Sequence, residues 1–139
     1  RGEEALDMPQ AMNTGHDGSL STGHANSPQG MISRLETMVL TGSAALPLPA
    51  IRQQIGTAVD YIVHLSRLRD FSRKTMEVTE VLGYNETTGQ VELNPIFKFE
   101  EERGFTDGKV HGKLVRTKNR IQNREKWELS GIYDYLEDE

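Results

Sequence analysis

The chain has 139 residues, of which 35% are hydrophobic and 27% charged, a composition that suits one soluble globular domain with its own core. A formal net charge of −5 argues against nucleic acid as a partner, because nucleic-acid-binding proteins are usually basic. The absence of cysteine excludes disulfides and thiolate metal sites and fits a reducing cytoplasm.

Neither a membrane span nor a signal peptide is expected in these 139 residues. No apolar run reaches the roughly eighteen residues of a membrane span, and no signal-peptide pattern opens the chain. Arg1 stands where an initiator methionine is expected. We therefore expect the chain to be a fragment of a longer protein.

Residues 3–12 are predicted to form a first helix, with Ala5, Met8 and Met12 on one face. Pro9 interrupts this pattern, so we expect a kink or a later start. The following stretch, 13–27, is polar and glycine-containing, and a short buried strand is predicted within it at 18–22.

Two further helices are predicted from their capping residues and their apolar spacing. Ser27-Pro28 is a typical helix start, because the hydroxyl can cap free amides and proline suits the first turn. The apolar face of this helix consists of Met31, Leu35, Met38 and Val39, and Gly42 is expected to end it. The next helix is expected from Pro47 and Pro49 to about Asp60, with Ile51, Ile55, Ala58 and Val59 on one side.

From residue 61 on, the apolar residues no longer recur at helical spacing but at every second position, which indicates strands. Strands are predicted at 61–66, 76–82, 91–93 and 96–99, with a turn at 85–89, and at 110–115 after a tight Asp107-Gly108 turn. A terminal helix is predicted from the spacing of Leu129, Ile132, Tyr133 and Leu136, with Trp127 as its packing anchor. The fold class is therefore α/β for residues 1–68, followed by an antiparallel β extension and a terminal helix at 69–139.

The segment 14–27 is the most informative for chemistry. It places His16 and His24 in polar loops on either side of the predicted short strand, and Asn26 just before the helix capped by Ser27. Ligands of open α/β sheets collect at the ends of strands, and free amides at a helix start favour an anion such as phosphate. Two alternatives to a phosphate contact stay open. These histidines could bond only to backbone, or they could bind a metal, although no further ligand completes a set.

Other charged and histidine residues have structural explanations that compete with functional ones. Residues 109–126 contain seven Lys or Arg against Glu125 alone, which favours a solvated hairpin face or a subunit contact over a nucleic-acid or lipid patch. Arg34 and Glu36 are surface charges by default, with subunit or nucleotide contact as the alternative. His64 is expected in the core, and His111 has no predicted role.

The runs along the chain resemble the CpaF (tight-adherence pilus) family of type II/IV secretion ATPases. The resemblance covers essentially the whole chain, specifically over the first 40 residues and loosely at the tail. It is carried by Arg1-Gly2, Glu4-Ala5-Leu6-Asp7-Met8, Thr14-Gly15-His16-Asp17-Gly18-Ser19, Ser21-Thr22-Gly23-His24-Ala25-Asn26-Ser27-Pro28, Ser33-Arg34-Leu35-Glu36-Thr37-Met38-Val39 and Ile51-Arg52-Gln53-Gln54-Ile55.

This resemblance implies the carboxy-terminal part of a RecA-like ATPase core that forms a hexameric ring in the cytoplasm, at the inner face of the cell membrane. The ring would power pilus assembly or protein secretion through an inner-membrane platform protein, with ATP and Mg²⁺ as its cofactors. The resemblance also assigns site residues. Arg1 would end the Walker B segment, and Thr14, Gly15 and His16 would lie near the nucleotide. His24 would be the histidine-box contact to the γ-phosphate, with Ser21, Thr22 and Asn26 around it.

The sequence departs from that family pattern in three ways. It has no G-x-x-x-x-G-K-[ST] loop, it lacks the Walker B carboxylate and the acidic box, and Pro9 replaces an apolar helical residue. The Mg²⁺ ligands would therefore lie outside this chain, and we expect the chain alone to be inactive. The alternative function is a non-catalytic assembly or interaction module, because a sheet without its upstream strands leaves an edge unpaired.

Overall fold

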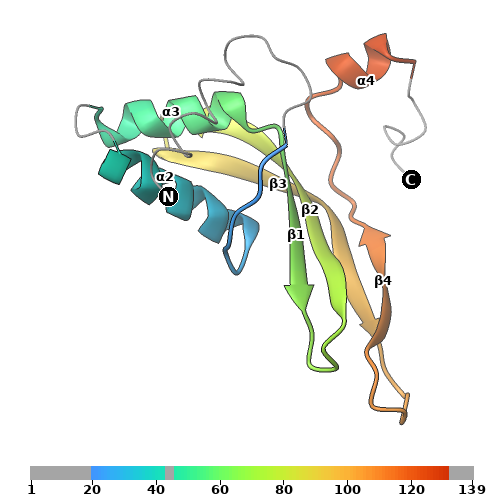
Figure 1. Ribbon diagram of the computed structural model, residues 1–139. Coiled ribbons are helices and arrows are strands. Elements are labelled where there is room, and N and C mark those ends of the chain that lie inside the picture. The colour runs from blue at the N-terminus through green and yellow to red at the C-terminus, as the bar shows by residue number, and fades with distance from the viewer. Residues whose placement is uncertain (1–19, 43–45, 132–139) are drawn as a thin grey trace. The chain divides into compact units, whose positions relative to one another are not determined.

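The computed structural model describes residues 20–42 and 46–131. The described elements are α2 (Pro28–Gly42), α3 (Leu48–Ala58), β1 (Tyr61–Arg67), β2 (Arg73–Asn85), β3 (Gln90–Glu102), β4 (His111–Arg116) and α4 (Glu125–Leu129) (Figure 1). The helix predicted over 3–12 lies outside the described residues. Within the described part of the chain, no helix has the length and apolarity needed to cross a bilayer.

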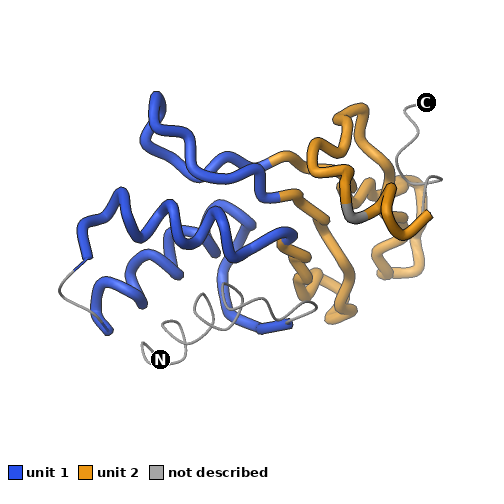
Figure 2. The backbone as a smooth tube through the Cα atoms, turned by 90° about the horizontal axis from the view of Figure 1, so that it is seen from above, with its two compact units in different colours: residues 1–61, 81–93 blue, residues 62–80, 94–139 orange. Residues whose placement is uncertain are grey.

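The chain divides into two compact units, which are coloured separately in Figure 2. Unit 1 contains the described part of residues 1–61 together with 81–93, and unit 2 contains 62–80 together with the described part of 94–139. Both β2 and β3 contribute residues to each unit. The domain organisation expected from the sequence, 1–68 and 69–139, stays a prediction.

Helix α2 forms as predicted, and its cap is visible. The backbone N–H of Gly30 donates to the Ser27 hydroxyl at 2.9 Å, which satisfies one of the first-turn amides. Of the predicted apolar face, Leu35 and Val39 are buried, but Met31 and Met38 are only half-buried, and Ile32, which the prediction left out, is buried instead. Gly42 is the last residue of the helix, as expected.

Helix α3 also confirms its prediction and ends slightly early, at Ala58. Pro47 caps it without a side-chain hydrogen bond, and Ile51 and Ile55 are buried on the side that packs with α2. Gly56 allows α3 to approach β2 closely, because a Cβ at this position would lie 2.8 Å from the backbone nitrogen of Tyr84. The core of unit 1 is therefore the two helices against the adjoining ends of β2 and β3.

The four strands form one sheet in the order β1-β2-β3-β4. Strands β3 and β4 are antiparallel, with Phe97 opposite Arg116 and Glu102 opposite His111. Two strand predictions need correction. The strands expected at 91–93 and 96–99 are one continuous strand, β3, because proline at 95 is compatible with extended backbone and its carbonyl still accepts a bond from Thr117 Oγ1 at 2.7 Å.

The connection between β3 and β4 is also longer than the predicted tight turn. It spans residues 103–110, and its chain reversal uses Gly104 and Gly108, whose φ angles of 98° and 73° are readily adopted only by glycine. The hairpin itself is confirmed.

The strand predicted at 18–22 is wrong in its described part. Leu20, Ser21 and Thr22 have no strand conformation, and the Leu20 side chain is 98% exposed. A strand needs a neighbour for its backbone hydrogen bonds, and the described sheet consists of β1 to β4 without residues 20–22.

The core of unit 2 contains Ile96 and Ile121, with Phe97 and Trp127 packed against them. This confirms Trp127 as the packing residue of α4. The predicted continuation of that helix to Leu136 lies outside the described residues.

Candidate functional site

The described part of the candidate site is the segment 20–27, which leads directly into α2. The side chains of Ser21, Thr22, His24 and Asn26 are all exposed. The other predicted site residues, Arg1, Thr14, Gly15 and His16, lie outside the described residues. These four residues are neighbours in the sequence, and the structure adds that all four are exposed.

Two contacts hold this segment on α2. Ser27 caps the helix through the 2.9 Å bond from Gly30. Gly23 lies so close to Met31 that a Cβ at position 23 would overlap the methionine side chain. The segment that carries His24 is therefore joined to α2 at Ser27, and at Gly23 it lies next to the flexible end of the Met31 side chain in the first turn of the helix.

The start of α2 offers fewer free amides to an anion than the sequence predicted. Pro28 has no N–H, Gly30 donates to the Ser27 hydroxyl, and Met31 donates to the Ser27 carbonyl at 2.9 Å. The N–H of Gln29 is the first-turn amide without an acceptor among the described residues. One amide attracts an anion weakly, so side chains have to supply most of any anion contact.

The exposed side chains have the right chemistry for the edge of a phosphate group. Ser21 and Thr22 provide hydroxyls, Asn26 an amide and His24 an imidazole, and each can donate a hydrogen bond to a phosphate oxygen. They cannot cradle a triphosphate, because the chain has no phosphate-binding loop with its lysine. No group of His, Asp or Glu that could hold a metal ion is found among residues 20–42 and 46–131.

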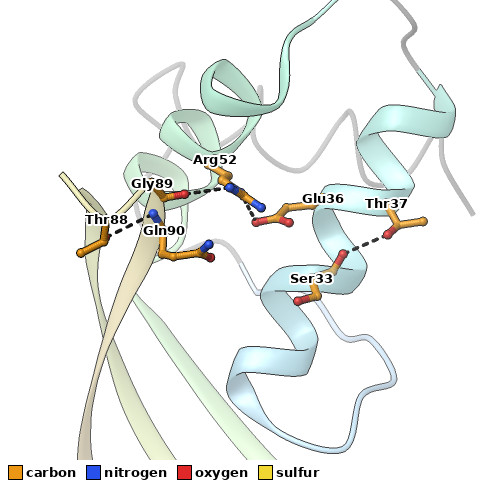
Figure 3. A network of polar contacts seen from close by, with 7 residues as sticks. All are labelled: Ser33, Glu36, Thr37, Arg52, Thr88, Gly89 and Gln90. Carbon is orange, nitrogen blue, oxygen red and sulfur yellow. Dashed lines mark hydrogen bonds and ion pairs between the residues drawn. The ribbon is translucent and has the colours of Figure 1, made fainter. Parts of the chain in front are cut away.

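A polar network joins three elements of unit 1 (Figure 3). Arg52 on α3 donates from Nε to Glu36 on α2 at 3.0 Å and from Nη1 to the carbonyl of Gly89 at 2.8 Å. Glu36 is therefore the partner of an intrachain ion pair, whereas Arg34 is exposed. No local pattern in the sequence indicates this role of Arg52, because its partners lie 16 and 37 residues away.

The two histidines outside the segment occupy unit 2. His64 is half-buried on β1. His111 at the start of β4 bonds through Nε2 to Asp107 at 2.8 Å and stacks on Phe105. The backbone N–H of Lys109 and the His111 ring both donate to the Asp107 carboxylate, which lowers its pKa. These contacts stiffen the β3–β4 loop.

The basic stretch 109–126 is partly used within the chain. The Arg116 guanidinium donates to the carbonyls of Asn119 and Thr117 at 2.7 and 3.1 Å, while Lys113 and Lys118 are exposed. This arrangement agrees with a solvated hairpin face.

Comparison with known proteins places the chain among secretion proteins. The family described as "Type II/IV secretion system protein" matches residues 1–118. A protein of Mycobacterium tuberculosis named for conjugal transfer is 31% identical over 107 residues, which cover 77% of this chain and 28% of that protein. An uncharacterized protein of Methanocaldococcus jannaschii is 33% identical over 102 residues, covering 73% and 35% of the two chains.

A third relative, the conjugal transfer protein TrbB of Rhizobium radiobacter, is 35% identical over 88 residues, covering 63% of this chain and 26% of TrbB. The matched regions span between 26% and 35% of the lengths of these relatives. Because the family match extends over most of the sequence, the chain belongs to the type II/IV secretion system protein family.

Proposed function

We propose that this chain is the carboxy-terminal part of a RecA-like, ATP-hydrolysing motor of the CpaF kind, which assembles as a hexameric ring. The proposal is supported by the family match over residues 1–118 and by two relatives named for conjugal transfer. The motor would act in the cytoplasm at the inner face of the cell membrane, driving pilus assembly or protein secretion through an inner-membrane platform protein.

The observation that carries the proposal at the level of residues is the exposed His24 segment at the start of α2. ATP with Mg²⁺ would supply the phosphoryl group for hydrolysis. In this proposal His24 donates a hydrogen bond to a terminal phosphate oxygen, and Ser21, Thr22 and Asn26 contact neighbouring oxygens. Arg1, Thr14, Gly15 and His16 belong to the same proposed site.

The chain alone does not supply the whole site. A phosphate-binding loop and a Walker B carboxylate are missing from its sequence, so these groups would come from outside residues 1–139. We therefore expect the 139-residue chain to hydrolyse no ATP by itself.

His24→Ala tests this role in the longer protein that carries the chain. We expect ATP turnover to fall about a hundredfold, as when one preorganised donor to a developing charge is removed. His111→Ala is the matched control, because that histidine lies in unit 2 and bonds to Asp107. Turnover that stays at the level of the unchanged protein in His24→Ala would remove the histidine from the mechanism.

A second candidate function, an assembly module, is favoured by β1. This strand lies at the edge of the sheet, and its side chains Val63 and Leu65 are 52% and 61% exposed. Among the described residues no strand pairs with this edge, and an edge strand with apolar side chains favours pairing with another strand.

Titration of the isolated chain with ATP and Mg²⁺, together with sedimentation over a range of concentrations, separates the two functions. Oligomers that form without nucleotide binding and are dispersed by Val63→Lys would support the module. A chain that stays monomeric at high concentration would exclude it.

A further inference from the structure

Arg52 links α2, α3 and the β2–β3 turn through a single guanidinium group. Its Nε bonds to Glu36 at 3.0 Å and its Nη1 to the Gly89 carbonyl at 2.8 Å. Figure 3 shows Glu36 pointing from α2 toward Arg52, with the turn on the other side of the guanidinium. The two acceptors belong to segments far apart in the sequence, so the network fixes tertiary structure.

This contact is protected from water more than an ordinary surface ion pair. The Arg52 and Glu36 side chains are 21% and 13% exposed. Partial burial reduces competition from water and salt, so the two hydrogen bonds hold their geometry better than an exposed pair. Lysine cannot replace arginine here, because one ammonium group lacks the planar fork that reaches both acceptors.

The buried hydrophobic side chains of α2 make apolar contacts, which are weakly directional. Ile32, Leu35 and Val39 bury one face of the helix, but hydrophobic burial depends on area and tolerates small shifts along or around the helix axis. The Arg52–Glu36 bond is directional, and it lies on the same helix that carries the His24 segment through Ser27 and Gly23.

We propose that Arg52 is a positioning residue that sets the place of α2 and, through α2, the place of His24. Its effect on catalysis rests on the proposed function. Its effect on α2 does not, and the two can be measured separately. Displacement of a phosphate contact by about 1 Å is enough to cost a hundredfold in rate.

Hydrogen exchange of the 139-residue chain measures the effect on α2. In Arg52→Lys we expect the amides of α2 to exchange roughly tenfold faster or more, the equivalent of losing one charge-assisted hydrogen bond. The amides of β4 in unit 2 should keep their rates. Arg34→Lys is the matched control, because Arg34 is exposed on α2 itself. Unchanged exchange of α2 in Arg52→Lys would overturn the proposal.

Steady-state turnover in the longer protein measures the effect on His24. We expect Arg52→Lys and Glu36→Ala to lower kcat about tenfold to a hundredfold with little change in KM, because binding survives and alignment is lost. Glu36→Gln keeps an acceptor for Arg52 Nε and should recover most of the rate. If Glu36 only stabilises the fold, Glu36→Gln and Glu36→Ala should have the same kcat at temperatures where both variants are folded.

The outcomes separate the two proposals. If His24→Ala slows turnover and Arg52→Lys leaves kcat unchanged, Arg52 has no positioning role and the proposed function stands. If His24→Ala leaves turnover unchanged, the proposed function loses its site, and the exchange rates alone decide whether Arg52 positions α2.

Discussion

Asp70 and Val110 join the two hairpin loops of unit 2, because the Asp70 Oδ2 accepts a hydrogen bond from the Val110 backbone N–H at 2.8 Å. The other carboxylate oxygen accepts bonds from the Ser72 hydroxyl and backbone N–H at 2.5 and 3.0 Å. One side chain therefore builds the β1–β2 turn and anchors the β3–β4 loop.

The first prediction follows from the charge of Asp70. Donation by the Ser72 hydroxyl, and then by the Val110 amide, holds the pKa of Asp70 well below its ordinary value. A depressed pKa in the folded state stabilises the chain above the ordinary carboxyl pKa of about 3.9. This stabilisation is lost as the pH falls through the lowered folded-state pKa.

Asp70→Asn should therefore lower the urea midpoint at neutral pH. The substitution replaces one carboxylate oxygen by an amide nitrogen, which cannot accept a hydrogen bond, so either the bonds from Ser72 or the bond from Val110 is lost. The difference from the unchanged chain should narrow as the pH falls below the ordinary carboxyl range. Asp60→Asn is the control, since Asp60 is an exposed carboxylate for which no side-chain bond is found in the described structure. If the urea midpoints of Asp70→Asn and the unchanged chain differ by the same amount at all pH values, the lowered pKa of Asp70 does not contribute to stability.

Glu80 is the basis of the second prediction. Its side chain is fully buried in β2 and accepts backbone N–H bonds from Gln122 and Asn123 at 2.9 and 2.8 Å, and a side-chain bond from Asn94 at 3.2 Å. These bonds hold the segment that leads to α4. We expect Glu80→Gln to lower the free energy of unfolding by about 1–3 kcal/mol, because its amide nitrogen faces a donor.

Trp127 reports on this change directly. It is the single tryptophan of the chain and packs against Ile96 and Ile121, so release of the segment should shift its fluorescence to longer wavelength. Glu86→Gln in the exposed β2–β3 turn is the control. Urea unfolding followed by this fluorescence measures both variants, and equal midpoints would contradict the role of Glu80.

Local patterns predicted α2 and α3 well because their signals lie within the helices. Ser27 and Pro28 mark the start of α2, Gly42 marks its end, and the apolar residues recur at helical spacing. The single strand β3 was predicted as two, although proline is tolerated in a strand where the neighbouring chain does not need its N–H. The sequence could not show that Thr117, 22 residues away, bonds to the Pro95 carbonyl.

The candidate site was predicted from a family resemblance more than from physical patterns. In its described part, the strand predicted at 18–22 is wrong because Leu20 is exposed, and burial of an apolar residue depends on a neighbouring strand that local sequence does not reveal. Arg52 escaped detection for the related reason that a single charged residue on a helix has no pattern. Its function depends on Glu36 and Gly89, which only the tertiary fold brings together.

Gly56 provides the third prediction, in which packing and helix propensity oppose each other. Glycine inside a helix is less favourable than alanine by about 1 kcal/mol, so Gly→Ala would ordinarily stabilise α3. Here the added methyl group would lie 2.8 Å from the Tyr84 nitrogen and 3.0 Å from the Gly83 Cα, both of which are backbone atoms. Backbone cannot move aside as a flexible side chain can, and overpacking costs about 1–3 kcal/mol.

We therefore expect Gly56→Ala to lower the thermal midpoint. Thr57→Ala is the matched control, because Thr57 is exposed on the next position of α3 and should gain slightly from the higher helix propensity of alanine. Opposite shifts in the two variants would show that α3 is seated on β2 through Gly56. A rise in both midpoints would mean that α3 can move away from β2 at little cost, and the close approach at Gly56 would then contribute nothing to stability.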